Sequence, residues 1–323
     1  MQLLTGKTMA PNGNAVAPPV RSAGAGCAVV AVTVTYNSAD VLDDFLKSVL
    51  LQKGDWSLII VDNASTDGTR QRLADIEDDR IRVIFNDTND GFAAGTNIGI
   101  RNALRAGAAA ILLMNNDTVF DDSLFAGLVS ELATTKADAI SPVIVFEHDP
   151  TMIWYAGGHL DWARGVKVIH EHFERPVEMA GSATFETSFC PACCMLFTRS
   201  AMETAGLLDE DFFVYWEDAE HCLRMSAAGL KIMVTPKLRI LHKASILTGG
   251  MLSDFSLYQQ YQNRMILLRK TGNPLIVAYG VIAVGAAVAG RFLLKGDSRR
   301  GAWLRAKAMW SGLRRPLQQR PPL

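Results

Sequence analysis

Polar and acidic side chains follow three short apolar segments that have the length and composition of buried β-strands. The segments are residues 28–35, 56–61 and 110–114. The polar residues directly after them are Tyr36-Asn37, Asp62-Asn63 and Asn115-Asn116-Asp117. A single polar strand end is ordinary, because such side chains cap the following helix. Three such ends, each with an amide or a carboxylate, indicate one polar ligand that all three hold.

Two adjacent acids, Glu217 and Asp218, begin a segment that predicts a helix over residues 217–228, ended by Gly229. A carboxylate can act as a general base that takes a proton from an attacking hydroxyl. Neighbouring carboxylates repel each other, which can raise the pKa of one of them. Alternatively, the two charges complement the dipole at the helix N-terminus. The residues alone leave both roles open.

Three of the five cysteines crowd together at Cys190, Cys193 and Cys194. Their C-x-x-C spacing is compatible with a zinc or redox site, but no second pair stands at metal-ligand spacing. Packing of these side chains in the core is the alternative to such a site. An odd number of cysteines does not indicate a disulfide framework, and it favours a reducing compartment.

The elements that must position these residues alternate between strand and helix through the first half of the chain. Helical segments are expected at residues 40–51, 67–75 and 97–106, and a further strand at 81–85. This alternation predicts an α/β fold with a mainly parallel sheet, whose ligands bind at the carboxyl ends of the strands. No G-x-G-x-x-G follows the first strand, which argues against a dinucleotide-binding dehydrogenase.

After Pro142 the alternation weakens, and the second half is expected to be mixed, with longer loops. The expected elements are strands at 143–146, 154–160, 166–170, 195–197, 231–234 and 239–242, and helices at 200–205 and 217–228. We also expect a helix starting at Asp121.

The amino-acid composition excludes several classes of protein. The 323 residues are 49% hydrophobic and 20% charged, which excludes a disordered chain, a collagen or a coiled coil. Residues 1–26 hold Pro, Gly, Asn and Ala without a sustained apolar run, so we interpret them as a disordered leader and not a signal peptide. The formal net charge of −1 gives no support for nucleic-acid binding by the whole molecule.

The end of the chain differs from the rest. From Arg291 onward there are nine basic residues against one acid, Asp297. The preceding stretch from Pro274 is uncharged and approaches the ~20 residues that span a bilayer. With Trp303 and Trp310 as interfacial anchors, it predicts association with an anionic membrane surface. The alternative is a helix buried in the protein.

Five motifs in this order resemble family 2 glycosyltransferases, most closely the rhamnosyltransferase-type branch. They are VTVTYN (32–37), VDNASTDGT (61–69), NDGFAAGTNIGI (89–100), LLMNNDT (112–118) and LLDEDFFVYWEDAEHCLR (207–224). The resemblance covers residues 28–245. It implies the GT-A fold, a Rossmann-like mainly parallel sheet, in residues 27–250. Residues 251–323 would then form a C-terminal helical, basic, membrane-associated region.

The resemblance also implies roles for the strand-end residues. Asp62 would accept from the donor's pyrimidine base, and Tyr36 would pack on that base, although a half-buried core tyrosine is the alternative. Asp117 and His242 would hold a divalent cation, Mg²⁺ or Mn²⁺. Asn115 stands where the family's Asp-X-Asp signature has its first acid. The remaining donor-binding residues would be Thr35, Asn37, Asn63, Gly91, Gly95, Asn97, Asn115 and Asn116, with the glycines in a turn close to a phosphate or sugar.

For catalysis, the resemblance implies that Asp218 is the base and that Glu217 assists it. The expected function is an inverting, metal-dependent transfer of a sugar, rhamnose from dTDP-rhamnose, to a lipid-linked or polysaccharide acceptor at the cytoplasmic face of the membrane. Two alternatives stay open. One is the same fold with a galactofuranose, glucose or N-acetylhexosamine donor, and the other is an inactive membrane-bound scaffold, which Asn115 in place of an acid would suit. Because every expected strand lies before residue 243, we expect truncation after Thr271 to leave a soluble, folded catalytic domain.

Overall fold

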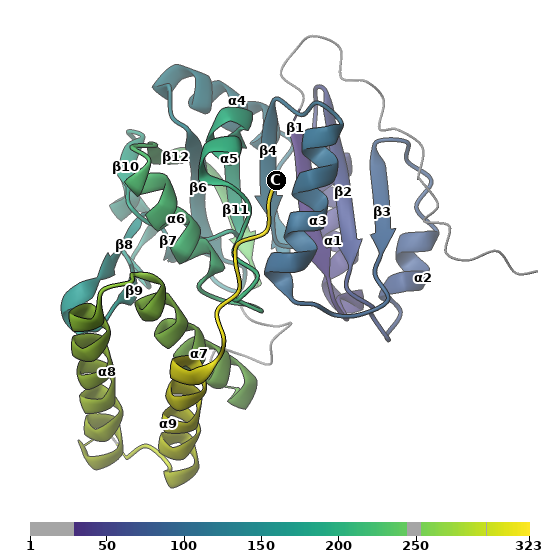
Figure 1. The fold of residues 1–323 in the computed structure, drawn as a ribbon. Helices are drawn as coiled ribbons and strands as arrows, with labels where there is room; N and C mark the ends of the chain where they lie inside the picture. Colours follow the sequence, from purple (N-terminus) through teal and green to yellow (C-terminus); the bar gives the residue numbers. More distant parts are fainter. Residues whose placement is uncertain (1–28, 244–252, 295) are drawn as a thin grey trace, which may run out of the picture.

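The computed structural model describes residues 29–243, 253–294 and 296–323 (Figure 1). The predicted leader therefore lies outside the described residues. A single 10-stranded sheet forms the centre, with eight strands in the order β10-β12-β6-β11-β4-β1-β2-β3 and β5 and β7 paired at its side. The mixed, partly parallel sheet with its helices confirms the predicted α/β fold.

The first half of the chain makes the parallel part of the sheet. The strands β1 (Val29–Thr35), β2 (Trp56–Asp62), β3 (Ile81–Phe85) and β4 (Ala110–Met114) all run parallel to their neighbours within this part. The helices between them are α1 (Ala39–Leu50), α2 (Thr69–Ala74) and α3 (Phe92–Arg105). Strands β1, β2 and β4 are buried because β-branched and aliphatic side chains fill them, so they read as continuous apolar runs, whereas the edge strand β3 is only partly buried.

Helix α3 packs on β1 and β2 at very short range. A Cβ added at Gly99 would lie 2.2 Å from Cγ1 of Val32, so only glycine fits there. The helix begins at Phe92 and not at residue 97 as expected. Gly91, with φ +95°, supplies the left-handed turn, and the Phe92 amide donates to the Phe213 carbonyl over 2.6 Å. That bond to a distant segment fixes the early start of the helix.

The second half of the chain adds strands of mixed direction and a small hairpin: β6 and β12 pair in parallel, and the remaining pairings are antiparallel. The strands are β5 (Thr118–Val119), β6 (Ala139–Phe146), β7 (Ile153–Tyr155), β10 (Phe185–Thr187), β11 (Cys194–Thr198) and β12 (Ile232–His242), and the hairpin pairs β8 (Gly158–Asp161) with β9 (Lys167–His170). Its helices are α4 (Leu124–Thr135), α5 (Arg199–Ala205) and α6 (Glu217–Ala227), with short 3-10 turns η1 (Trp162–Arg164) and η2 (Val177–Ala180).

Four expected boundaries in this half were wrong. The strand expected over 143–146 already begins at Ala139. The strand expected over 154–160 is two strands, because Gly157 with φ +87° breaks it. The segments expected at 231–234 and 239–242 are one strand, β12, with an irregularity between Thr235 and Arg239. The helix expected from Asp121 begins at Leu124.

Three helices end the chain and lie below the sheet in Figure 1. They are α7 (Asp254–Lys270), α8 (Pro274–Leu294) and α9 (Arg299–Arg314). Helix α9 packs closely on α7, since a Cβ added at Gly312 would lie 2.2 Å from the Gln262 carbonyl oxygen. Helix α8 docks on η1, where the Tyr279 hydroxyl donates to the Ala163 carbonyl over 2.6 Å.

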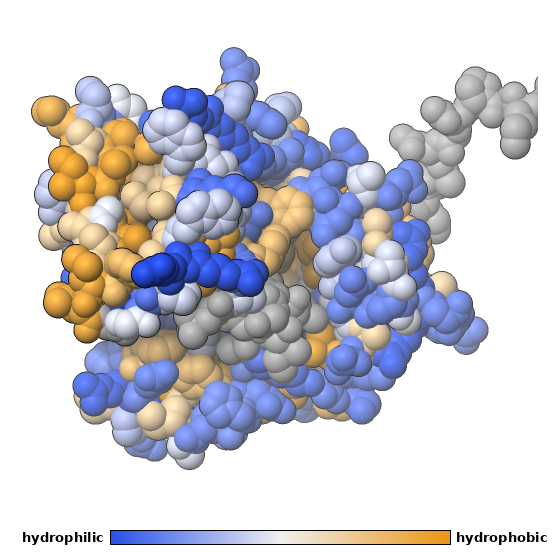
Figure 2. Space-filling model, turned by 90° about the horizontal axis from the view of Figure 1, so that it is seen from below, coloured by the Kyte–Doolittle hydropathy of each residue, from blue (hydrophilic) through white to orange (hydrophobic). Residues whose placement is uncertain are grey.

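Helix α8 is long and apolar enough to cross a membrane by length and composition, and only 17% of its most apolar window is buried. Leu275, Ile282 and Leu294 are 70–86% exposed. Figure 2 shows apolar surface along the left side of the molecule, where α8 lies in Figure 1. The alternative of a helix buried within the protein therefore does not describe this exposed face.

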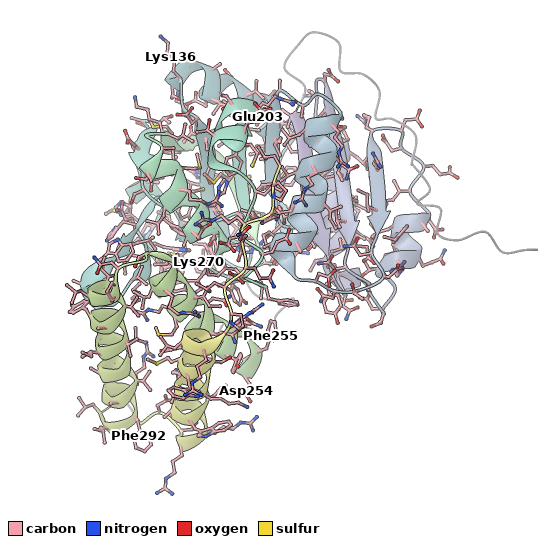
Figure 3. The ribbon with its side chains drawn as sticks, in the orientation of Figure 1. Lys136, Glu203, Asp254, Phe255, Lys270 and Phe292 are labelled. Atoms are coloured by element: carbon pink, nitrogen blue, oxygen red, sulfur yellow. The ribbon has the colours of Figure 1, made fainter. Side chains whose placement is uncertain are left out.

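The C-terminal helices are nevertheless tied into the sheet domain by buried charges. Lys270 at the end of α7 lies 2.7 Å from Asp209 and 2.6 Å from Asp211, and all three side chains are buried. Arg320 reaches Glu220 on α6 over 2.7 Å and Asp209 over 3.3 Å. Figure 3 shows Lys270 at the end of α7 nearest the sheet, opposite Asp254. Truncation after Thr271 would keep Lys270 and its two carboxylates but remove Arg320. The folding of the truncated chain stays a prediction.

Candidate active site

A cavity of 1370 Å³ opens at the carboxyl ends of β1 and β4 and continues toward α7 and α8. Its wall combines strand ends from the parallel half, the start of α6 and the C-terminal helices. Nine of the predicted site residues line it: Tyr36, Asn63, Gly91, Asn115, Asn116, Asp117, Glu217, Asp218 and His242. The fold thus brings the strand-end cluster and the acidic pair, about a hundred positions apart in sequence, to one cavity.

The other five predicted residues, Thr35, Asn37, Asp62, Gly95 and Asn97, are not among those that line this cavity. The Asp62 side chain is fully buried and accepts from the Thr35 hydroxyl over 3.0 Å and from Ser65 over 2.5 Å. Its second oxygen lies 3.4 Å from Arg70. In this arrangement Asp62 holds the loop after β2 in place, and its contact with a donor base stays a prediction.

Asn97 and Gly95 serve packing inside α3 and not a phosphate-facing turn as expected. The Asn97 amide donates to the Leu208 carbonyl over 2.9 Å and to Glu210 over 2.8 Å, and its oxygen accepts from the Leu208 amide. It therefore joins α3 to the loop that leads toward α6. A Cβ added at Gly95 would lie 3.0 Å from the Asn63 side chain, so glycine lets Asn63 sit against the helix.

Asn37 and Asn116 hold the loop geometry around β1. Asn37 adopts a left-handed φ of +50°, and its side-chain oxygen accepts from the Thr66 amide over 2.8 Å. Asn116 donates to the Val34 carbonyl over 3.1 Å and to the Ser38 hydroxyl over 2.9 Å. Tyr36, in contrast, is 45% exposed and lines the cavity, so its ring is free to contact a ligand. A half-buried core tyrosine does not describe it.

Asp117 and His242 form a buried pair in the cavity wall. The short strand β5 follows Asp117 directly and pairs Thr118 with His242, which brings the two side chains together. The His242 Nε2 lies 3.3 Å from Oδ1 of Asp117, and both side chains are 6% exposed. His242 also meets the Trp154 ring edge-to-face at 4.5 Å between centroids.

The carboxylate oxygen and the imidazole nitrogen of this pair are suitable ligands for a divalent cation. The Asp117 Oδ1 and the His242 Nδ1 are buried without a hydrogen-bond partner, a costly state unless another group satisfies them. Within the described residues no group of three His, Cys, Asp or Glu could hold a metal. A cation here would therefore take most of its ligands from a bound diphosphate and water, as Mg²⁺ commonly does.

The acidic pair follows a strained turn. Tyr215 and Trp216 both adopt left-handed conformations, with φ of +69° and +77°, just before α6 begins at Glu217. Such conformations persist only where surrounding contacts impose them. Here the buried Asn263 of α7 donates to the carbonyl oxygens of Val214 and Tyr215, each over 2.9 Å. The sequence analysis did not find Asn263, because nothing in its neighbourhood marks a contact 48 residues away.

Burial separates the two acids in protonation. It raises the pKa of Asp218 to about 6, even though the carboxylate accepts from backbone amides including that of Ala219 over 2.7 Å. Burial, and then repulsion from Asp218, raises the pKa of Glu217 well above its ordinary value. Burial and mutual repulsion therefore disfavour two charges on this pair, and Asp218, whose carboxylate accepts from backbone amides, is the acid better placed to ionise and accept a proton. Pairs with separated pKa values are typical of acid–base sites.

The crowded cysteines agree with the packing interpretation. Cys190, Cys193, Cys194 and Cys222 are buried free thiols. Burial raises the pKa of Cys190 to about 12, which leaves it unreactive at neutral pH. The Cys190 amide donates to the Cys222 sulfur over 3.4 Å, so the segment before β11 packs on α6.

The family is shown by comparison with known sequences. The sequence model described as Glycosyl transferase family 2 matches residues 30–206, more than half of the chain. The chain therefore belongs to glycosyl transferase family 2 and is a nucleotide-sugar glycosyltransferase. The match includes the strand-end cluster and stops before the acidic pair.

Curated relatives are similar over most of their length. A dTDP-rhamnosyl transferase of Shigella flexneri is 25% identical over 77% of this chain and 83% of its own. A low-salt glycan biosynthesis hexosyltransferase of Haloferax volcanii is 24% identical, over 73% of each chain. An N-acetylglucosaminyl-diphospho-decaprenol L-rhamnosyltransferase of Mycobacterium tuberculosis is 26% identical over 68% of this chain and 76% of its own.

Solved structures with the same fold confirm the GT-A architecture. GalNAc-T7, solved with UDP, GalNAc and Mn²⁺, superposes with a TM-score of 0.60 at 15% identity, over 87% of this chain and 54% of its own. A mannosyltransferase of Pyrobaculum calidifontis, solved with GDP-mannose and Mn²⁺, gives 0.54 at 17% identity, over 88% and 83%. At these identities the likeness shows the fold.

Proposed function

We propose that the protein transfers rhamnose from dTDP-rhamnose to a lipid-linked or polysaccharide acceptor in cell-envelope glycan synthesis, with inversion and with a divalent cation. One observation carries the proposal: the Asp117–His242 pair and the Glu217–Asp218 pair line the same cavity. The rhamnosyl donor is supported by the names of the relatives from Shigella flexneri and Mycobacterium tuberculosis. Both neighbouring structures were solved with Mn²⁺, which supports the use of a divalent cation.

On the donor side, Asp117 and His242 would hold the cation, which neutralises charge on the leaving diphosphate. The Asp117 Oδ1 and the His242 Nδ1, both buried without a hydrogen-bond partner, support this role. Tyr36 would pack on the base, while Asn63, Gly91, Asn115 and Asn116 shape the wall where the nucleotide lies. Thr35, Asn37, Asp62, Gly95 and Asn97 would support this wall from behind.

On the acceptor side, the carboxylate of Asp218 would take the proton from the attacking hydroxyl. The new bond forms between that oxygen and the anomeric carbon, and the bond from this carbon to the diphosphate oxygen breaks. Attack opposite the leaving group inverts the anomeric configuration. Burial and repulsion from Asp218 raise the pKa of Glu217, which disfavours a second charge beside the base. Asn263 positions both acids through the turn before α6.

The exposed apolar face of α8 and the basic residues after it support placement at an anionic, cytoplasmic membrane surface. We assign residues 27–250 to the transferase and 251–323 to a helical, membrane-associated region that shares the site. Two alternatives keep the same fold: a donor of galactofuranose, glucose or N-acetylhexosamine, and an inactive scaffold.

The test incubates the purified full chain with Mn²⁺, lipid-linked and polysaccharide acceptors, and a panel of nucleotide sugars, and reads product mass. We expect a gain of one deoxyhexose with dTDP-rhamnose. A gain with another nucleotide sugar alone contradicts the donor assignment. Nucleotide binding without any product under every pairing favours the scaffold.

A further inference from the structure

Four cations line the part of the cavity that lies against α8, and they have few counter-charges. They are Arg164 on η1, Lys167 on β9, Arg264 on α7 and Arg291 on α8. Arg164 pairs with Asp161 over 3.3 Å. Over the described ranges, 29–243, 253–294 and 296–323, the side chains of Lys167 and Arg291 make no ion pair or hydrogen bond. Arg164, Lys167 and Arg291 are solvent-exposed, so a ligand that enters the cavity can reach them.

The four charges act on one another. Partial burial, and then repulsion from Arg164, Arg291 and Arg264, lowers the pKa of Lys167. Burial lowers the pKa of the Arg264 guanidinium, which donates to the Gly165 carbonyl over 3.0 Å and also to the Arg164 carbonyl. Arg264 therefore holds the η1 turn in position, while Lys167 and Arg291 keep their donors free. Cations in this arrangement suit a ligand that carries more than one negative charge.

An apolar helix face borders the cations. Ala283, Ala287, Gly290 and Leu294 line the same cavity, and their spacing of three and four residues places them on one face of α8. The helix is docked closely, since a Cβ added at Gly165 would lie 2.9 Å from the Gly280 carbonyl oxygen and 3.2 Å from the Ala283 Cβ. The small side chains leave room beside the helix, and the wall continues to its exposed apolar end.

The cavity is also larger than one ligand requires. Small-molecule sites are commonly about 300–1,000 Å³, and this cavity has 1370 Å³. One part of it has the Asp117–His242 pair and Tyr36, where the donor is proposed to lie. The cations belong to the part formed by η1, β9, α7 and α8, with Asp218 in the same cavity.

We propose that Lys167 and Arg291, on a wall positioned by Arg264 and Arg164, bind the diphosphate of an isoprenyl-diphosphate-linked acceptor, whose chain runs along α8. The inference rests on the proposed function, and it selects the lipid-linked acceptor over a free polysaccharide. Charge complementarity selects the diphosphate, and the apolar face that borders the cations selects a hydrocarbon chain attached to it. The acceptor sugar would then reach toward Asp218.

The test measures binding of geranylgeranyl diphosphate to the full chain in EDTA, so that no metal at Asp117 contributes. Geranylgeraniol and inorganic pyrophosphate are compared, because each carries half of the proposed ligand. We expect the wild type to bind the intact probe more tightly than either half. In Lys167→Gln/Arg291→Gln, affinity for the intact probe should fall about tenfold or more, since charged hydrogen bonds are lost. The affinity for dTDP in Mn²⁺ should not change.

A matched control, Arg299→Gln/Lys307→Gln, removes two exposed cations of α9 that lie outside the cavity wall. It should bind the probe as the wild type does. Equal losses in both double variants, or a loss seen only with vesicles of anionic phospholipid, would show that the cations serve the membrane surface and would overturn the proposal. A parallel loss of dTDP affinity would assign them to the donor and overturn it as well. Probe binding without rhamnosyl transfer would leave this subsite standing and refute the proposed function instead.

Discussion

The two ends of the cavity are built in different ways. The donor side consists of strand ends from β1, β2 and β4, where each polar residue follows its own strand by one to three positions. The acceptor side joins the start of α6 to α7, α8 and the η1 turn, through contacts between residues 48 to 116 positions apart. Local chain geometry places the first set, apart from His242, which the pairing of β12 with β5 brings to Asp117. Long-range packing places the second set.

The difference shows how the C-terminal helices take part in the enzyme. Asn263 of α7 holds the strained turn that precedes Glu217, and Lys270 neutralises the buried Asp209 and Asp211 in the loop before it. These contacts make α7 a support of the two acids proposed to be catalytic, besides any role at a membrane. Removing the helices should therefore damage the acceptor side first and leave the parallel half of the sheet folded.

The largest effect is expected from Asp218→Asn, which should impair the acceptor side of the cavity and leave the donor side intact. Transfer should fall by about 10²–10⁴-fold, the usual contribution of a general base, while dTDP affinity stays within about twofold because the base contacts the acceptor. Product formation and nucleotide binding are measured on the same preparations. Glu203→Gln, an exposed carboxylate on α5 (Figure 3), is the matched control. Transfer within about tenfold of wild type, only ~1.4 kcal/mol of barrier, would remove Asp218 from this role.

The same residue predicts a pH dependence with a defined sign. With the pKa of Asp218 raised to about 6, kcat/KM should rise as pH increases through that value, because only the ionised acid accepts a proton. For stability, a raised acid pKa means that the folded state binds the proton more tightly. Its contribution is present below the unfolded pKa of about 3.9 and is lost as pH rises through about 6. Asp218→Asn should therefore gain more in Tm relative to wild type at pH 8 than at pH 5.

The sequence predicted the donor side far better than the acceptor side, for physical reasons. Apolar runs with β-branched residues indicate parallel strands, and the polar residues after them must meet at one edge, so Asn115, Asp117 and Tyr36 could be placed. The start of α3 could not, because it depends on the Phe213 carbonyl. Asn263 and Lys270 could not be placed either. They lie on α7, which shows no marked amphipathic pattern, and their partners come from other segments.

The next effect concerns stability and tests whether the C-terminal helices belong to the catalytic fold. Lys270→Met leaves Asp209 and Asp211 buried without their nearest cation, which should lower the free energy of unfolding by about 3–5 kcal/mol. Lys136→Met, at an exposed lysine in Figure 3, is the matched control and should unfold as wild type. Should Lys270→Met not fold, Arg320→Gln, which removes a side chain 46% exposed, offers a milder loss. Unchanged unfolding curves for both would make the C-terminal helices an independent appendage.

The smallest effect is expected at Asp117 and His242, the two residues on the donor side that are proposed to hold the divalent cation. Asp117→Ala should weaken dTDP binding about tenfold in Mn²⁺, because a charged ligand to the cation is lost. In EDTA the variant and the wild type should bind dTDP alike. Asp117 Oδ1 makes no hydrogen bond and lies 3.3 Å from His242 Nε2, so without metal the substitution removes this one contact and should lower Tm only slightly. His242→Gln should weaken binding in the same metal-dependent way, and the double variant should lose less than the sum, since both residues act through one ion. Equal losses with and without metal would instead show that Asp117 shapes the end of β4, and the donor side would then bind the diphosphate without the cation proposed here.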